Sequence, residues 1–162
     1  MSIFDLVLTL ILAWGLIVIF FIDLDHQIIP DKILLPLVLI FLVYKTLNSL
    51  FIIHNSVFSF ILPAFVSSLF LFLIFVLTKG KGMGFGDVKL AFLMGLFLGY
   101  PKVVVAFYLA FLTGAFFGII LVLIKKAKIG QKIAFGPFLV FGIFVSYLWG
   151  EKIISLVEKL LF

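Results

Sequence analysis

The chain has 162 residues, of which 66% are hydrophobic and only 12% are charged, and its mean hydropathy is +1.47. A soluble domain carries roughly 45–50% apolar and about 25% charged residues, so this composition excludes an aqueous globular fold and indicates a membrane protein. The absence of cysteine excludes disulfides, zinc–thiolate sites and a thiol nucleophile. The net charge of +5 comes from lysine alone, and these lysines flank apolar runs, which indicates membrane orientation and no nucleic-acid binding.

Apolar runs of membrane-spanning length recur along the chain. A span requires about 20 mainly apolar residues at a rise of about 1.5 Å per residue. The sequence therefore predicts an all-α membrane protein, a single membrane-embedded domain over residues 1–162, with six transmembrane helices at residues 4–22, 33–53, 57–78, 87–100, 103–124 and 133–149. The first run has no basic flank and no small-residue cleavage site, so we expect a retained span and no removable signal peptide.

The final segment, residues 151–162, differs from the spans in its pattern. Its apolar residues recur at helical spacing opposite charged residues, which predicts either a C-terminal amphipathic helix at the membrane interface or an extension of the sixth span. We assign it no catalytic role.

The lysines also predict an orientation. The three loops after the first, third and fifth spans hold seven lysines, and the opposite side holds four. By the positive-inside rule, the lysine-rich side faces the cytoplasm, and we expect a multi-pass protein of the inner (cytoplasmic) membrane with both termini outside.

Two aspartates stand at span ends on this cytoplasmic side. Asp23 follows the first span and Asp87 begins the fourth, so one crossing and three crossings bring both carboxylates to the same face. Ionisable groups at membrane depth usually face a bundle interior or a water-filled cavity. Two carboxylates that share a site hold one proton between them, which suits peptide hydrolysis without a metal or cofactor. We therefore predict Asp23 and Asp87 as catalytic residues that activate water.

The residues around Asp87 refine this hypothesis. Gly84 and Gly86 precede it and permit close approach of an extended peptide, so we assign both glycines to substrate binding. A helix N-terminus favours an ionised Asp87, whereas Asp23 lies near a helix C-terminus, so we expect Asp23 to hold the shared proton.

Other polar residues are interpreted differently. Asp25 lies two positions after the first catalytic candidate, about 200° around a helix, so only one of the two can face Asp87. Asp31 is interpreted as a helix cap, and Lys89 as a snorkelling residue, with an electrostatic role toward the acidic pair as the alternative. His26 and Asp25 do not complete a metal-ligand set.

Small residues recur at every fourth position on two expected helices. They are Ala91, Gly95 and Gly99 on the fourth, and Ala106, Ala110, Gly114 and Gly118 on the fifth. Such stripes let membrane helices approach closely. We therefore expect the fourth and fifth helices to pack on each other and to direct Asp87 into protein.

Three segments resemble motifs of a known family. Phe-Ile-Asp-Leu-Asp-His-Gln-Ile-Ile-Pro-Asp at 21–31 is similar to the first aspartate motif of the type IV prepilin peptidases. Gly-Phe-Gly-Asp-Val-Lys at 84–89 resembles their Gly-x-Gly-Asp motif, and Phe-Gly-Pro-Phe at 135–138 is similar to a late element. The resemblance implies an enzyme that cuts the short basic leader from type IV prepilins or pseudopilins after a glycine, at the cytoplasmic face, with Asp23 and Asp87 as the catalytic pair.

This chain differs from many members of the family in one respect, and a second family shares one of its motifs. Many bacterial members carry a cysteine-rich segment associated with N-methylation of the pilin, and this chain has no cysteine, so it resembles a compact, peptidase-only form without methyltransferase activity. Presenilin-like enzymes share Gly-x-Gly-Asp, but Ile-Pro-Asp after Asp23 favours the prepilin branch.

The alternative function is a small proton- or cation-coupled transporter, in which Asp23 and Asp87 bind the ion. Transporters often show paired repeats and helices broken in mid-span, and the sequence shows neither.

Overall fold

The computed structural model describes residues 3–51, 58–124 and 134–161, and these residues form six α-helices. The helices are α1 (Ile3–His26), α2 (Asp31–Phe51), α3 (Phe58–Leu77), α4 (Phe85–Leu98), α5 (Lys102–Leu123) and α6 (Gly136–Leu161). The predicted all-α membrane architecture is confirmed, and it follows from the composition because a helix satisfies its backbone polar groups within its own segment in lipid. The expected helix ends at residues 53, 57 and 133 lie outside the described residues.

Helix α4 is shorter than its neighbours. Five helices of the described residues are long and apolar enough to cross a membrane, and α4 is not among them. Its 14 residues extend about 21 Å, against about 30 Å for the hydrocarbon core of a bilayer. The predicted fourth span is therefore a short helix, and most of it is buried, including Leu90, Ala91, Met94 and Leu96.

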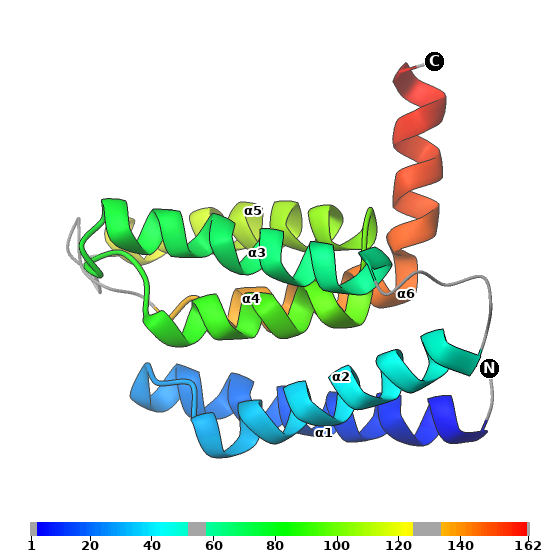
Figure 1. Ribbon diagram of the computed structural model, residues 1–162. Coiled ribbons are helices and arrows are strands. Elements are labelled where there is room, and N and C mark those ends of the chain that lie inside the picture. Colours follow the sequence, from blue (N-terminus) through cyan, green and yellow to red (C-terminus); the bar gives the residue numbers. More distant parts are fainter. Residues whose placement is uncertain (1–2, 52–57, 125–133, 162) are drawn as a thin grey trace.

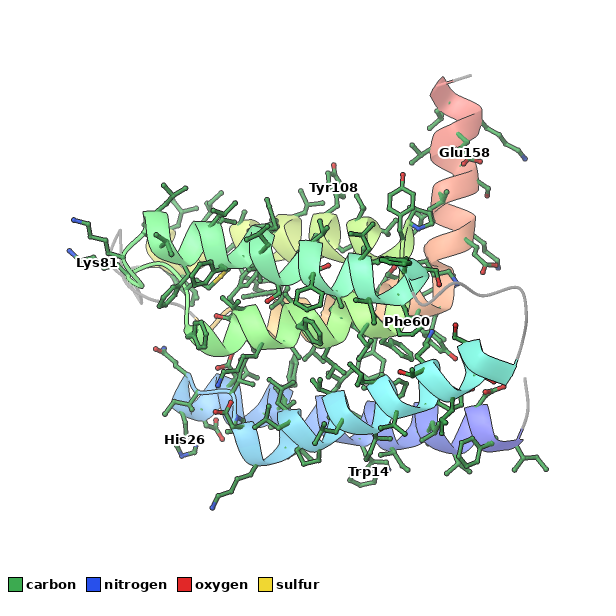
Figure 2. All side chains as sticks on the ribbon, viewed as in Figure 1. Trp14, His26, Phe60, Lys81, Tyr108 and Glu158 are labelled. Carbon is green, nitrogen blue, oxygen red and sulfur yellow. The ribbon has the colours of Figure 1, made fainter. Side chains whose placement is uncertain are left out.

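The helices form two layers (Figure 1). The antiparallel pair α1 and α2 makes one layer, and the other is two helices deep: α4 and α6 face the first layer, and α3 and α5 cover them on the far side. The layers meet where α2 packs on α4 and where α1 packs on α6. Fully buried side chains form the core of the bundle, among them Leu12, Leu16, Ile19, Leu34, Leu93, Leu139 and Ile143. Large apolar side chains on the outer faces, such as Trp14 and Tyr108, are exposed from the protein and suited to lipid (Figure 2).

The small-residue stripes pack on partners other than the expected ones. Helix α4 packs mainly on α3, where a Cβ added at Gly95 would collide with the carbonyl oxygen of Pro63. Helix α5 packs mainly on α6, where a Cβ added at Gly142 would collide with the carbonyl oxygen of Ala106. The prediction that the fourth and fifth helices pair through their stripes is therefore wrong, because small residues permit close approach without choosing the partner.

The C-terminal segment continues helix α6, which runs without interruption from Gly136 to Leu161. Its last turns leave the bundle and point across the direction of the other helices (Figure 1). A salt bridge of 2.8 Å between Lys102 Nζ and Glu151 Oε1 ties the start of this extension to α5. The segment is therefore a helix continuous with α6, and its direction across the bundle suits the predicted amphipathic helix at the membrane interface.

Candidate active site

Asp23 lies in the last turns of α1 and faces into the protein. Its side chain is 4% exposed, whereas Asp25 and His26 are exposed at the end of the same helix. Its Oδ2 atom accepts a hydrogen bond of 3.0 Å from the backbone N–H of Gly136, the first residue of α6. The geometry thus agrees with the choice of Asp23 over Asp25 as the residue that faces the interior.

Asp87 lies in the first turn of α4. The helix begins at Phe85 with Gly84 as its N-cap, so the predicted start at Asp87 is two residues late. The Oδ2 atom of Asp87 accepts a hydrogen bond of 2.9 Å from the backbone N–H of Gly84, and the side chain is 5% exposed. This bond satisfies one of the donors that a helix start leaves without an intrahelical partner.

A cavity of about 250 Å³ brings the two aspartates together. Residues of the segments 23–31 and 84–89 line it, including both carboxylates, and Phe135 closes it from the segment before α6. Gly84 and Gly86, which we assigned to substrate binding, also line this cavity. The structure therefore places all four predicted site residues around one space, at the end of the bundle where His26 and Lys81 lie (Figure 2).

Two residues of the site, Gly136 and Ile29, were not predicted from the sequence. A Cβ added at Gly136 would lie 2.5 Å from Asp23 Oδ2 and 3.3 Å from Ile29 Cδ1, so any larger residue would force the carboxylate or α6 to move. Ile29 is 7% exposed, and a Cβ added at Gly86 would lie 2.8 Å from its Cβ. Gly86 is therefore a close-packing position as well as a cavity residue. The segment 135–138 resembles a family motif, but no feature of the sequence near Gly136 indicates a hydrogen bond to Asp23.

The environment of Asp23 changes the expectation about the shared proton. That expectation relied on the C-terminus of α1, which lies next to this side chain. The structure adds the N-terminus of α6, whose first N–H bonds to the same carboxylate. Both carboxylates thus contact a helix N-terminus, that of α6 for Asp23 and that of α4 for Asp87, and the difference in helix dipoles no longer assigns the proton to Asp23.

Asp31 and Lys89 form an ion pair at the edge of the cavity. Lys89 Nζ lies 2.7 Å from both carboxylate oxygens of Asp31 and 5.4 Å from the centre of the Phe85 ring. Asp31 is the first residue of α2 and binds a lysine, so its interpretation as a helix cap is wrong. Lys89 reaches across to another helix and does not simply extend to the membrane surface.

Two aspartates buried around one cavity of a membrane helix bundle mark a functional site, and paired aspartates are the catalytic groups of aspartic-type proteases. The model of the type IV leader peptidase family matches residues 10–119, a range that contains both Asp23 and Asp87. The chain therefore belongs to this family, as the three motifs had suggested.

Relatives agree with this assignment. The chain is 34% identical over 145 residues to the prepilin leader peptidase/N-methyltransferase of Pseudomonas aeruginosa, a match that covers 89% of the chain and 50% of the relative. The proteins of the same name from Legionella pneumophila and Bacillus subtilis are 34% and 32% identical, over 93% and 90% of the chain and over 53% and 56% of their own lengths. The chain thus spans about half the length of these relatives. No solved structure matched it.

Proposed function

We propose that this protein is a membrane aspartic endopeptidase that removes the short basic leader from type IV prepilins or pseudopilins at the cytoplasmic face of the inner membrane. The observation that carries the proposal is the meeting of buried Asp23 and Asp87 around one cavity. Membership of the type IV leader peptidase family supports a leader peptide as the substrate. The proposal covers the peptidase activity alone, because the matches cover about half of relatives whose name also includes a methyltransferase.

Hydrolysis follows from a pair of carboxylates that holds one proton. The ionised carboxylate takes a proton from water, and the resulting hydroxide attacks the carbonyl carbon of the scissile bond. The protonated carboxylate donates its proton to the carbonyl oxygen, which gives a neutral tetrahedral intermediate. When the C–N bond breaks, the amine leaves with a proton from the first carboxylate, and the diol returns one to the second. The products are a carboxylic acid and an amine, and the pair regains its single proton.

The backbone contacts of the two aspartates suit this cycle. Each carboxylate has one oxygen held by a backbone N–H, from Gly136 for Asp23 and from Gly84 for Asp87. These bonds fix the orientation of both groups on rigid helix ends. The glycine-rich wall at residues 84–86 presents little side-chain bulk to the cavity, which supports approach of an extended peptide backbone.

The same observations favour a peptidase over an ion transporter. Transporters bind their ions near the middle of the membrane, often where helices are broken. Asp23 lies in the last turns of a continuous helix and Asp87 in the first turn of another, at one end of the bundle. Family membership points in the same direction.

Cleavage of a purified prepilin in detergent tests the proposal. Asp23→Asn and Asp87→Asn should each lower kcat/KM by about 10⁴-fold or more, because either change removes the shared proton chemistry. Asp25→Asn is the matched control: the same change on an exposed side chain two residues away should leave cleavage close to wild type. Size-exclusion profiles establish that all variants are folded.

Two outcomes would contradict the proposal. One is substantial cleavage by either catalytic variant. The other is a wild-type protein that processes none of several prepilins but drives proton-coupled uptake in vesicles, which would establish the transporter instead.

A further inference from the structure

The two proposed catalytic aspartates lie in different layers of the fold. Asp23 belongs to the layer of α1 and α2, and Asp87 belongs to the layer that contains α4 (Figure 1). The spacing of the two carboxylates therefore depends on how the layers sit on each other at this end. A device that fixes the two layers here also fixes the geometry of the pair.

The ion pair between Asp31 and Lys89 crosses the same boundary. Asp31 is the first residue of α2, and Lys89 lies two residues after Asp87 in α4. Both carboxylate oxygens accept from the ammonium group at 2.7 Å, which makes a strong charge-assisted contact. The side chains remain 33% exposed for Lys89 and 50% exposed for Asp31. A pair this exposed adds little to overall stability.

An apolar contact reinforces the ion pair next to it. Ile29 lies two residues before Asp31 and is 7% exposed. It lies so close to Gly86 that a Cβ added there would be 2.8 Å from the Ile29 Cβ. The segment that follows Asp23 is thus held on the first turns of α4 at two points, one apolar and one ionic.

We propose that Asp31 and Lys89 form a clamp between the layers that holds Asp23 and Asp87 at the spacing needed to share a proton. Both are positioning residues that act through the catalytic pair. The inference rests on the proposed function, because it concerns the same site. A displacement of about 1 Å in a catalytic group can lower a rate about 100-fold. The clamp therefore affects turnover far more than it affects folding.

Steady-state kinetics on a prepilin test the clamp. Asp31→Asn and Lys89→Met should each lower kcat by about 10- to 100-fold and change KM by less than about threefold, since the pair is loosened while each new side chain nearly keeps the size of the one it replaces at the edge of the cavity. Lys89→Arg keeps the charge and should recover most of that loss. The exchange Asp31→Lys with Lys89→Asp restores opposite charges and should be at least about fivefold faster than the slower single variant.

The matched control is Lys32→Met, which removes one lysine charge next to Asp31 from an exposed position. The kcat of this variant should stay within about twofold of the wild-type value. The clamp would be overturned if Asp31→Asn and Lys89→Met also kept kcat within twofold of wild type. An exchange variant no faster than the slower single variant would overturn it too.

A distance measurement separates the clamp from the proposed function. The chain has no cysteine, so spin labels at His26→Cys and Lys81→Cys report on the two layers without background (Figure 2). Double electron–electron resonance measures the distribution of distances between the two labels. Asp31→Asn should broaden this distribution, and the charge exchange of Asp31 and Lys89 should narrow it again. A distribution that Asp31→Asn leaves unchanged would overturn the clamp whether or not a prepilin is cleaved. Broadening in a protein that cleaves no prepilin would contradict the proposed function and leave the clamp supported.

Discussion

The backbone N–H of Gly136 donates a hydrogen bond of 3.0 Å to Asp23 Oδ2, and the two residues are 113 positions apart in the chain. The bond joins the end of α1 to the start of α6. It exists because glycine has no Cβ at the point where the Asp23 carboxylate approaches the backbone of α6. The orientation of one proposed catalytic group therefore depends on a residue from the last helix.

Gly136→Ala should disable the site. The new Cβ would lie 2.5 Å from Asp23 Oδ2, closer than atoms can approach, so α6 or the carboxylate must move. We expect prepilin cleavage to fall by about 100-fold, as for a displaced catalytic group. Gly82→Ala is the control, because its Cβ would lie 3.4 Å from Thr78 Cγ2, an ordinary contact. Equal activity of the two variants would show that the Gly136 contact does not orient Asp23.

Gly86→Ala distinguishes packing from substrate contact. Its Cβ would lie 2.8 Å from the Ile29 Cβ, so the segment before α2 must shift away from α4. We expect a lower Tm in detergent together with a lower kcat, at a cost of about 1–3 kcal/mol for overpacking. A raised KM with an unchanged Tm would indicate instead that Gly86 serves only the bound peptide.

Gly95→Ala should destabilise the bundle through the contact between α3 and α4. The added Cβ would collide with the carbonyl oxygen of Pro63, which belongs to the backbone and cannot rotate away. We expect a loss of about 1–3 kcal/mol, measured as a lower Tm. Gly114→Ala is the matched helical control: its Cβ would lie 3.3 Å from the Phe135 ring, a side chain that can adjust. A larger loss at Gly114 would contradict this account of helix packing.

Single cysteines test the proposed orientation. The lysine distribution predicts that the end of the bundle with the cavity faces the cytoplasm. His26→Cys and Lys81→Cys, both exposed at that end, should react with an impermeant maleimide only after the cells are opened. Glu158→Cys, in the exposed last turns of α6, should react in intact spheroplasts. The reverse pattern would place the site on the outer face and contradict cleavage in the cytoplasm.

The helices and the location of the site were predictable because both follow from local features. Apolar runs define helices in lipid, and counting crossings brings Asp23 and Asp87 to one side without any tertiary information. The structure agrees with this counting, since both side chains line the same cavity.

The contacts between helices were not predictable in the same way. The small-residue stripes indicated close packing of α4 and α5, but Gly95 packs on α3 and Ala106 packs on α6. The ion pair between Asp31 and Lys89 joins residues 58 positions apart, and neither residue carries a local sign of the other. Which helices pack together depends on the shapes of whole helix surfaces, and a periodic pattern of small residues does not specify those shapes.

The short helix α4 has a consequence for the substrate of the proposed peptidase. Helix α3 extends past the first turn of α4 at the end where Asp87 lies (Figure 1), and the Asp87 side chain is only 5% exposed, so this carboxylate lies below the protein surface in a recess. A folded domain is too wide to enter such a recess, whereas a single unfolded strand can descend into it. In the proposed peptidase, this depth would act as a steric filter that spares compact proteins before any side chain of the substrate is recognised.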